Sequence, residues 1–132
     1  MSHTDSQEQA ILDAEFGLAS ATIPVGSHLV LCTAAPEDGT TGVSAATPLA
    51  FSSWQRQGAQ VNNRHRVIST AGAVLANTTA GQLVVSHIGW RVGAAGSVIN
   101  YMTLGGDTPT TVTLDAGEEL SFAAGELNFD LG

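Results

Sequence analysis

The sequence contains no lysine and few charged side chains of any kind. Only 12% of its 132 residues are Asp, Glu, Lys or Arg, about half of the usual ~25%. The basic residues are four arginines, and the formal net charge at neutral pH is −8. A surface this acidic is repelled by the phosphates of nucleic acids and by anionic membranes. The sequence therefore predicts neither a nucleic-acid partner nor a membrane partner.

Cysteine and long apolar runs are also scarce. The single cysteine, Cys32, excludes an internal disulfide and a zinc site built from several cysteines. No apolar run approaches the roughly 20 residues that a membrane-spanning helix needs. The polar, acidic start does not resemble a signal peptide. We therefore expect a protein that is made and folded in a cytosol, or at least one that is not exported by a recognisable signal.

The composition suffices for one compact domain. A chain of this length buries roughly two thirds of its unfolded surface, and 43% of the residues are apolar. Low charge together with many Gly, Thr, Ala and Ser residues is typical of a compact β protein rather than a disordered one. We expect residues 1–132 to form a single domain without repeats or linkers.

One helix is predicted, over residues 4–17. Ser6 and Gln9 fit a capping box at its start. Apolar residues recur at the spacing of one helix face and form a stripe of Ile11, Leu12 and Phe16. Because a helix this short is not stable alone, we expect this stripe to be buried, either on the chain's own β domain or on a neighbouring protein.

From residue 27 to 132 the sequence alternates short apolar segments with Gly and Asp turns. In the first segment, Leu29 and Leu31 share one face, while Val30 and Cys32 share the other. Both faces are apolar, so we expect this strand at the centre of a sheet. Turn signals recur about every 8–12 residues, which predicts roughly seven to nine strands. The predicted fold is mainly β: a single-domain antiparallel β-sandwich, jelly-roll-like, with one short N-terminal helix.

A long loop, residues 34–53, interrupts the predicted strands, and loops of this length usually carry function or contacts. A polar strand over 54–61 and a strand over 65–69 follow, and Asn62-Asn63 is a suitable turn to join them as a hairpin. This region holds three of the four arginines: Arg56, Arg64 and Arg66. We interpret them either as a basic strip that meets the acidic surface of another copy, or as a solvated face.

No group of residues has the sequence context of an active site or a metal site. Cys32 lies in an apolar strand, where a free cysteine usually packs as a small hydrophobe rather than acting as a nucleophile with His87. The histidines lack the spacing of metal ligands on one strand or helix. The acidic residues near the end form no calcium-binding loop. We therefore expect no enzyme activity, no metal and no cofactor.

Three aromatic side chains are candidates for stacking against a sugar ring: Trp54, Trp90 and Tyr101. Strand alternation places Trp90 on the same face as Ile88 and Val92, so we expect Trp90 in the core. Trp54 and Tyr101 remain as candidate glycan-binding residues.

Four segments carry recognisable motifs: the strand and turn at 29–36, the strand at 54–57, the strand at 85–90 and the stretch at 115–127. Kept in this order along nearly the whole chain, they resemble motifs of small tail fibre proteins of actinobacterial phages and prophages. Arg91 stands where that family often has Asp, and residues 62–77 fit it poorly. The resemblance implies a virion protein without catalytic residues, assembled in the host cytoplasm.

Two functions fit this resemblance. A complete fibre needs a shaft such as a coiled coil or a repeat, and this sequence has none. Our first hypothesis is therefore a minor capsid or decoration protein that binds the major capsid protein or another virion protein and stabilises the capsid. It would dock through the helix stripe (Ile11, Leu12 and Phe16), the long loop and the basic strip.

The alternative is a tail fibre or tail-tip module that binds host-surface glycans through Trp54 or Tyr101. In either case we expect the protein to associate with itself, as a trimer or else as a dimer.

Overall fold

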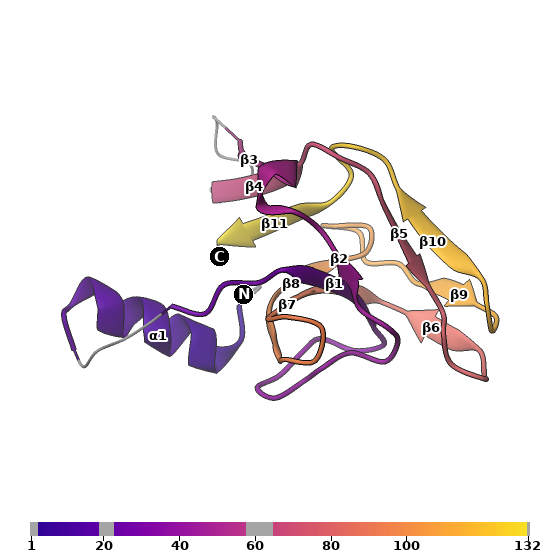
Figure 1. Cartoon of the computed structure of the whole chain (residues 1–132), viewed down its shortest axis with the longest axis horizontal. Coiled ribbons are helices and arrows are strands. Elements are labelled where there is room, and N and C mark those ends of the chain that lie inside the picture. Colours follow the sequence, from indigo (N-terminus) through magenta and orange to yellow (C-terminus); the bar gives the residue numbers. More distant parts are fainter. Residues whose placement is uncertain (1–2, 19–22, 58–64, 132) are drawn as a thin grey trace.

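The computed structural model describes residues 3–18, 23–57 and 65–131 and shows short antiparallel strands preceded by one helix (Figure 1). Helix α1 spans Asp5–Glu15. The strands, in chain order, are β1 (His28–Cys32), β2 (Thr47–Pro48), β3 (Trp54–Arg56), β4 (His65–Ser69), β5 (Ala73–Ala76), β6 (Leu83–Val85), β7 (His87–Arg91), β8 (Val98–Thr103), β9 (Val112–Leu114), β10 (Glu119–Phe122) and β11 (Asn128–Leu131). The mainly β class with one N-terminal helix is confirmed.

The strands form four antiparallel sheets around a shared core. Their orders are β2-β1-β7-β8, β11-β4-β3, β10-β5 and β6-β9. All four sheets contribute to the main core cluster, through residues such as Leu31, Leu75, Leu114 and Phe129. In Figure 1 the β3–β4–β11 sheet lies above the β1–β7–β8 strands, and α1 projects away from them on the left. This arrangement around one core fits the predicted sandwich, while the jelly-roll connectivity stays a prediction.

Strand β1 lies inside its sheet, as its two apolar faces predict. It pairs with β2 on one side and with β7 on the other. Leu29 and Leu31 belong to the main core, whereas Val30 and Cys32 form a second cluster with Val98 on the opposite face. Fully burying an aliphatic side chain stabilises a fold by about 1.5–3 kcal/mol. Apolar packing on both faces therefore anchors β1.

The apolar stretch 83–91 is divided between two sheets. Strand β6 pairs with β9, and β7 pairs with β1 and β8. Between them, Ser86 donates its backbone N–H to Cys32 O and accepts from Leu104 N, both at 3.0 Å. Val85 and Ile88 are both fully buried although three positions apart, so one residue is inserted into the two-residue alternation. This division helps to explain why the described part of the chain has more strands than expected.

The predicted loop 34–53 is mostly loop, but it contains β2 and a short 3-10 helix, Phe51–Ser53. The loop is fixed to the β body: Val43 N donates to Leu31 O at 3.0 Å, and Ser44 Oγ donates to Ala76 O at 2.6 Å. Gly42 has a φ of +86°, and a Cβ atom there would lie 2.2 Å from the Val30 side chain. The loop therefore closes over the second cluster.

The predicted pairing of the arginine-rich strands is confirmed, with Trp54 opposite Ser69 and Arg56 opposite Val67. Strand β3 covers only the first part of the predicted strand 54–61, and the expected Asn62-Asn63 turn lies outside the described residues. Within the described ranges, no helix has the length and apolar content needed to cross a membrane.

Candidate functional site: the surfaces around helix α1

Helix α1 is capped by the long loop and not by its own sequence. The residue before it, Thr4, makes no side-chain cap hydrogen bond. Ser6 donates both its backbone N–H and its Oγ to Asp38 Oδ1, each at 3.0 Å. The predicted capping box of Ser6 and Gln9 is therefore wrong, because a carboxylate 32 positions away replaces the local cap. A negative group at a helix start is favoured by the helix dipole, and here it also ties α1 to the body.

The side of α1 that faces the β body is polar. Thr4 is only 3% exposed and Gln7 only 5%. Gln7 Nε2 donates to Pro24 O at 3.1 Å, but among the described residues Gln7 Oε1 and Thr4 Oγ1 have no hydrogen-bond partner. A buried polar atom without a partner costs about 1–3 kcal/mol. Packing on this side therefore stabilises the helix position only weakly.

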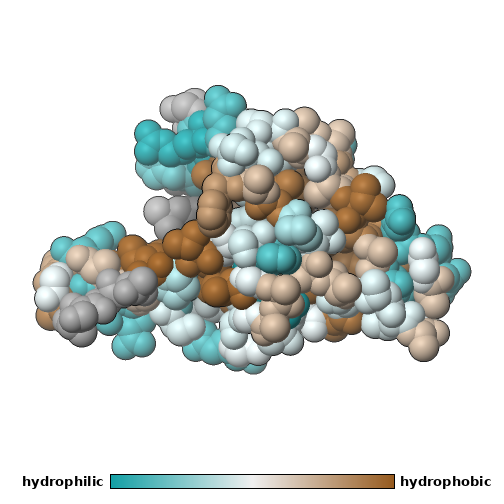
Figure 2. Space-filling model, in the orientation of Figure 1, coloured by the Kyte–Doolittle hydropathy of each residue, from teal (hydrophilic) through white to brown (hydrophobic). Residues whose placement is uncertain are grey.

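The apolar side of α1 faces away from the body. Leu12 is 55% exposed and Phe16 is 73% exposed, whereas Ile11 is partly buried. The residues after the helix add further exposed apolar side chains: Leu18, Ile23 and Val25. Figure 2 shows apolar atoms gathered where the helix joins the body. Two of the three residues of the predicted stripe are thus not buried on the chain's own β domain.

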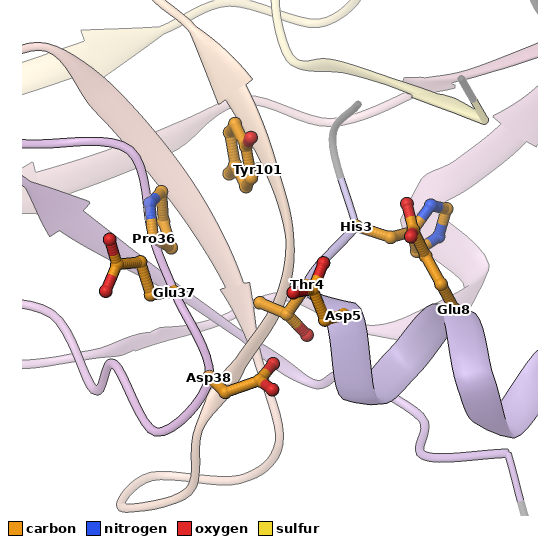
Figure 3. A pocket seen from close by; sticks show the side chains of 8 residues that line it. All are labelled: His3, Thr4, Asp5, Glu8, Pro36, Glu37, Asp38 and Tyr101. Atoms are coloured by element: carbon orange, nitrogen blue, oxygen red, sulfur yellow. The ribbon is translucent and has the colours of Figure 1, made fainter.

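A cleft opens between the start of α1, the first part of the long loop and strand β8 (Figure 3). Its volume is about 440 Å³, and it is lined by His3, Thr4, Asp5, Glu8, Pro36, Glu37, Asp38 and Tyr101. Half of these residues carry a carboxylate, and none is Lys or Arg. Over the described ranges, no three or more His, Cys, Asp or Glu side chains are grouped to hold a metal ion.

His3 adds little positive charge to the cleft at neutral pH. Burial lowers the pKa of its imidazole from 6.5, although the nearby Glu8 carboxylate opposes this shift. His3 also lies within 3.2 Å of the Asn100 side chain, Nε2 to Nδ2, and forms a β-bridge with this residue. The cleft is therefore open and negatively charged.

Tyr101 is the aromatic residue of the cleft, and β8 holds it in place. Its ring packs against the second cluster of Val30, Cys32 and Val98 and meets His87 edge-on at 5.5 Å. Figure 3 shows Tyr101 above Pro36 and Thr4 at one end of the labelled group. Tyr101, predicted as a candidate glycan-binding residue, therefore lies in a cleft.

Trp54 is packed into the edge of the main core. Its ring meets Trp90 at 5.1 Å and Phe129 at 5.5 Å, both in edge-on geometry. Its Nε1 is buried and has no hydrogen-bond partner in the described part of the chain. Trp90 also packs on the core, as strand alternation predicts. This packing argues against Trp54 as a sugar-stacking residue, because its neighbours occupy the space around its ring.

The arginines of the predicted basic strip have different environments. Arg56 is exposed at the end of β3, and Arg64 lies outside the described residues. Arg66 forms a bidentate ion pair with Asp130 of the neighbouring strand, with Nε–Oδ1 at 2.6 Å and Nη2–Oδ2 at 3.3 Å. The charge of Arg66 is thus neutralised within the chain. Partner binding by the strip stays a prediction.

The sequence alone did not reveal the cleft. Seven of its residues come from two segments, 3–8 and 36–38, and Tyr101 comes from β8. The acidic residues of both segments are visible in the sequence, but no local pattern indicates that Ser6 binds Asp38. A contact at that sequence separation follows from the tertiary fold, so single-sequence patterns do not predict it.

Comparison with known proteins defines the class of protein to which the chain belongs. Over residues 2–130 the chain matches the model of a family described as podophage GP4 fiber I protein gp80. Because the match covers nearly the whole sequence, the chain belongs to this family. It is therefore a phage fibre protein: a structural, non-enzymatic component of the virion, with other virion proteins as partners. No curated protein matches the chain. The resemblance to phage fibre proteins is confirmed, while the actinobacterial host lineage stays a prediction.

Proposed function

We propose that this fibre protein is an attachment module whose helix α1 docks onto a different protein of the virion. The observation that carries the proposal is the exposure of Leu12 in α1 and of Phe16 directly after it, at 55% and 73%, while the helix buries the polar Gln7. Contiguous exposed apolar surface on a soluble protein marks an interaction site. Leu18 and Val25, which follow the helix in the sequence, are also exposed, at 59% and 63%. We name these four residues the docking stripe.

Charge indicates what kind of partner fits the docking stripe. The second half of α1 carries Asp13 and Glu15, and the helix has no basic residue in its last turn. Two copies of α1 brought face to face would repel each other. An apolar groove flanked by Lys or Arg on another virion protein would match both the apolar side chains of the stripe and the negative charge of α1. Self-association through the arginine strip stays a separate prediction.

The docking proposal is tested on phage particles that lack the protein. Purified wild-type protein and the double variant Leu12→Ser, Phe16→Ser are mixed with these particles, and the protein that co-sediments is measured. Removal of two exposed apolar anchors should lower binding by about tenfold or more. The matched control is Val84→Ser, which removes a 48% exposed apolar side chain from β6 and should bind as the wild type does. Equal binding of the double variant would refute the proposal.

A second proposed function is recognition of host-surface glycans by the β body. It is supported by the cleft beside Tyr101 and by a family described by its fibre role and not by a capsid role. The same description supports this function better than our first hypothesis, capsid decoration. A glycan array probed with wild-type protein and Tyr101→Ala provides the test. Selective sugar binding that is lost in Tyr101→Ala is expected, and an array without any selective signal would refute this function.

A further inference from the structure

We infer that a second copy of this chain packs against an uncharged face of the β body, and that a twofold axis relates the two copies. This face lies on the body, whereas Leu12 of the docking stripe lies on α1, which projects away from the body in Figure 1. Three features of the face support a contact between copies: the absence of charge, the exposed apolar side chains and the opposite charges at its two ends.

Charge is missing from two long segments of the chain. Residues 39–55 and 67–106 contain a single residue among Asp, Glu, Lys and Arg, and this residue, Arg91, is only 7% exposed. Two copies of a chain with a net charge of −8 repel each other where their charged surfaces meet. The repulsion is smallest at an uncharged surface, and the cores of protein interfaces are depleted in charged residues.

The two uncharged segments lie side by side along β5, as Figure 1 shows for β2 and β5. Thr47 Oγ1 donates to Val74 O at 3.3 Å, and the Thr70 backbone N–H donates to Ser53 O at 2.7 Å. These hydrogen bonds fix the two segments before a partner binds, so less conformational entropy is lost on association. We name the exposed surface of these two segments the neutral seam, which comprises residues 43–53 and 70–78.

The neutral seam exposes large apolar side chains. Phe51 is 66% exposed, Val74 is 46% exposed and Val43 is 37% exposed. The other exposed residues of the seam are Ala, Pro, Ser, Thr or Gly. Figure 2 shows the middle of the β body mostly white to brown, with most of the strongly hydrophilic groups toward its ends. Removal of this apolar surface from water would drive association.

The neutral seam has a basic end and an acidic end. Beyond Phe51, the exposed Arg56 ends β3. At the other end, the exposed Glu119 of β10 lies opposite Ala76 of β5. By strand alternation, Glu119 shares the face of Val74. Two seams packed in opposite directions about a twofold axis would bring Arg56 of each copy toward Glu119 of the other.

A second copy fits the neutral seam better than an unrelated protein. A twofold contact joins the same surface of both copies, so that surface must be complementary to itself. An uncharged middle between opposite charges meets this requirement. Arg66 is already paired with Asp130, and this leaves Arg56 as the exposed arginine within the described ranges. Because the seam has few large side chains, we expect a weak dimer with a Kd on the order of 10–100 µM.

The test measures self-association of the full chain by analytical ultracentrifugation, at concentrations from well below to well above the expected Kd. The wild type should dimerise, and the double variant Phe51→Ser, Val74→Ser should dimerise at least about tenfold more weakly. Both side chains are exposed, so the double variant should keep the circular dichroism spectrum of the wild type. The matched control Val84→Ser removes a similarly exposed valine from β6 and should dimerise as the wild type does.

Exchange of the two end charges tests the twofold packing. Arg56→Glu and Glu119→Arg should each weaken the dimer several-fold, because each change brings like charges together. The variant that carries both changes should dimerise as the wild type does, since the two charges have only exchanged places. A variant that failed to fold could not restore the dimer, so restoration reports on the contact itself.

A chain that stays monomeric over the whole concentration range would overturn the inference. A dimer that is insensitive to Phe51→Ser, Val74→Ser would overturn it as well, because the copies would then meet elsewhere. A trimer, or a dimer that the double charge exchange does not restore, would contradict the twofold packing. None of these results affects the docking of α1, which is measured separately on phage particles.

Discussion

The β body and helix α1 treat apolar side chains in opposite ways. The body completely buries core residues such as Leu75 and Ile88, both at 0% exposure, whereas α1 buries Gln7 and exposes Leu12. The body therefore gains its stability from its own core. The helix gains little from its contact with the body, since two buried polar atoms of that contact have no partner within the described residues. This difference is the basis of our proposal that α1 binds a surface outside this chain.

The same substitution in the two regions should have very different effects. Leu75→Ala should lower the free energy of unfolding by about 2–5 kcal/mol, because it leaves a cavity in the main core. Leu12→Ala, in the exposed stripe, should change it by less than about 0.5 kcal/mol. Urea denaturation followed by circular dichroism measures both. Similar losses in the two variants would show that α1 is part of the core, and the comparison would fail.

Two glycines test whether the long loop belongs to the rigid body. Gly42 and Gly117 have similar φ angles, +86° and +83°, but a Cβ atom at Gly42 would lie 2.2 Å from Val30, whereas one at Gly117 meets nothing within 4 Å. Gly117→Ala should cost about 1–2 kcal/mol from backbone conformation alone. Gly42→Ala should cost about 1–3 kcal/mol more from overpacking. Equal losses in thermal denaturation would mean that the loop does not close over the second cluster.

The last prediction concerns the reactivity of the Cys32 thiol, which lies under that loop. Burial raises the pKa of Cys32 to about 11, so the thiolate fraction at pH 8 is on the order of 0.1%. The native protein should react slowly with a disulfide reagent at pH 8, and unfolding in urea should make the reaction fast. A Cys32→Ser, Thr33→Cys variant moves the thiol to the exposed next position and should react quickly without urea. Fast reaction of native Cys32 would show that the body opens readily here.

The elements with a strong local pattern were predictable from the sequence, and the contacts between distant segments were not. The two apolar faces of β1 indicated its position inside a sheet, and the alternation around Trp90 indicated its packing on the core. The division between β6 and β7 depends on one inserted residue, Ser86, which a count of apolar residues does not reveal. The polar side of α1 depends on Thr4 meeting β8 and on Gln7 meeting Pro24.

The candidate site was predictable only in part. The helix stripe was identified as a surface that needs a partner, because a short helix cannot be stable without burying it. The sequence left open whether that partner is the β body or another protein. Tyr101 was a candidate without a visible cleft, since the other residues of the cleft come from two segments that meet only in the folded chain.

The most direct test of this account measures stability and particle binding on one protein, the Leu12→Ser, Phe16→Ser double variant. If the stripe serves a partner and not the fold, the free energy of unfolding should stay within about 0.5 kcal/mol of the wild type while co-sedimentation with phage particles falls by about tenfold or more. A loss of stability of about 2 kcal/mol or more, with binding retained, would contradict it.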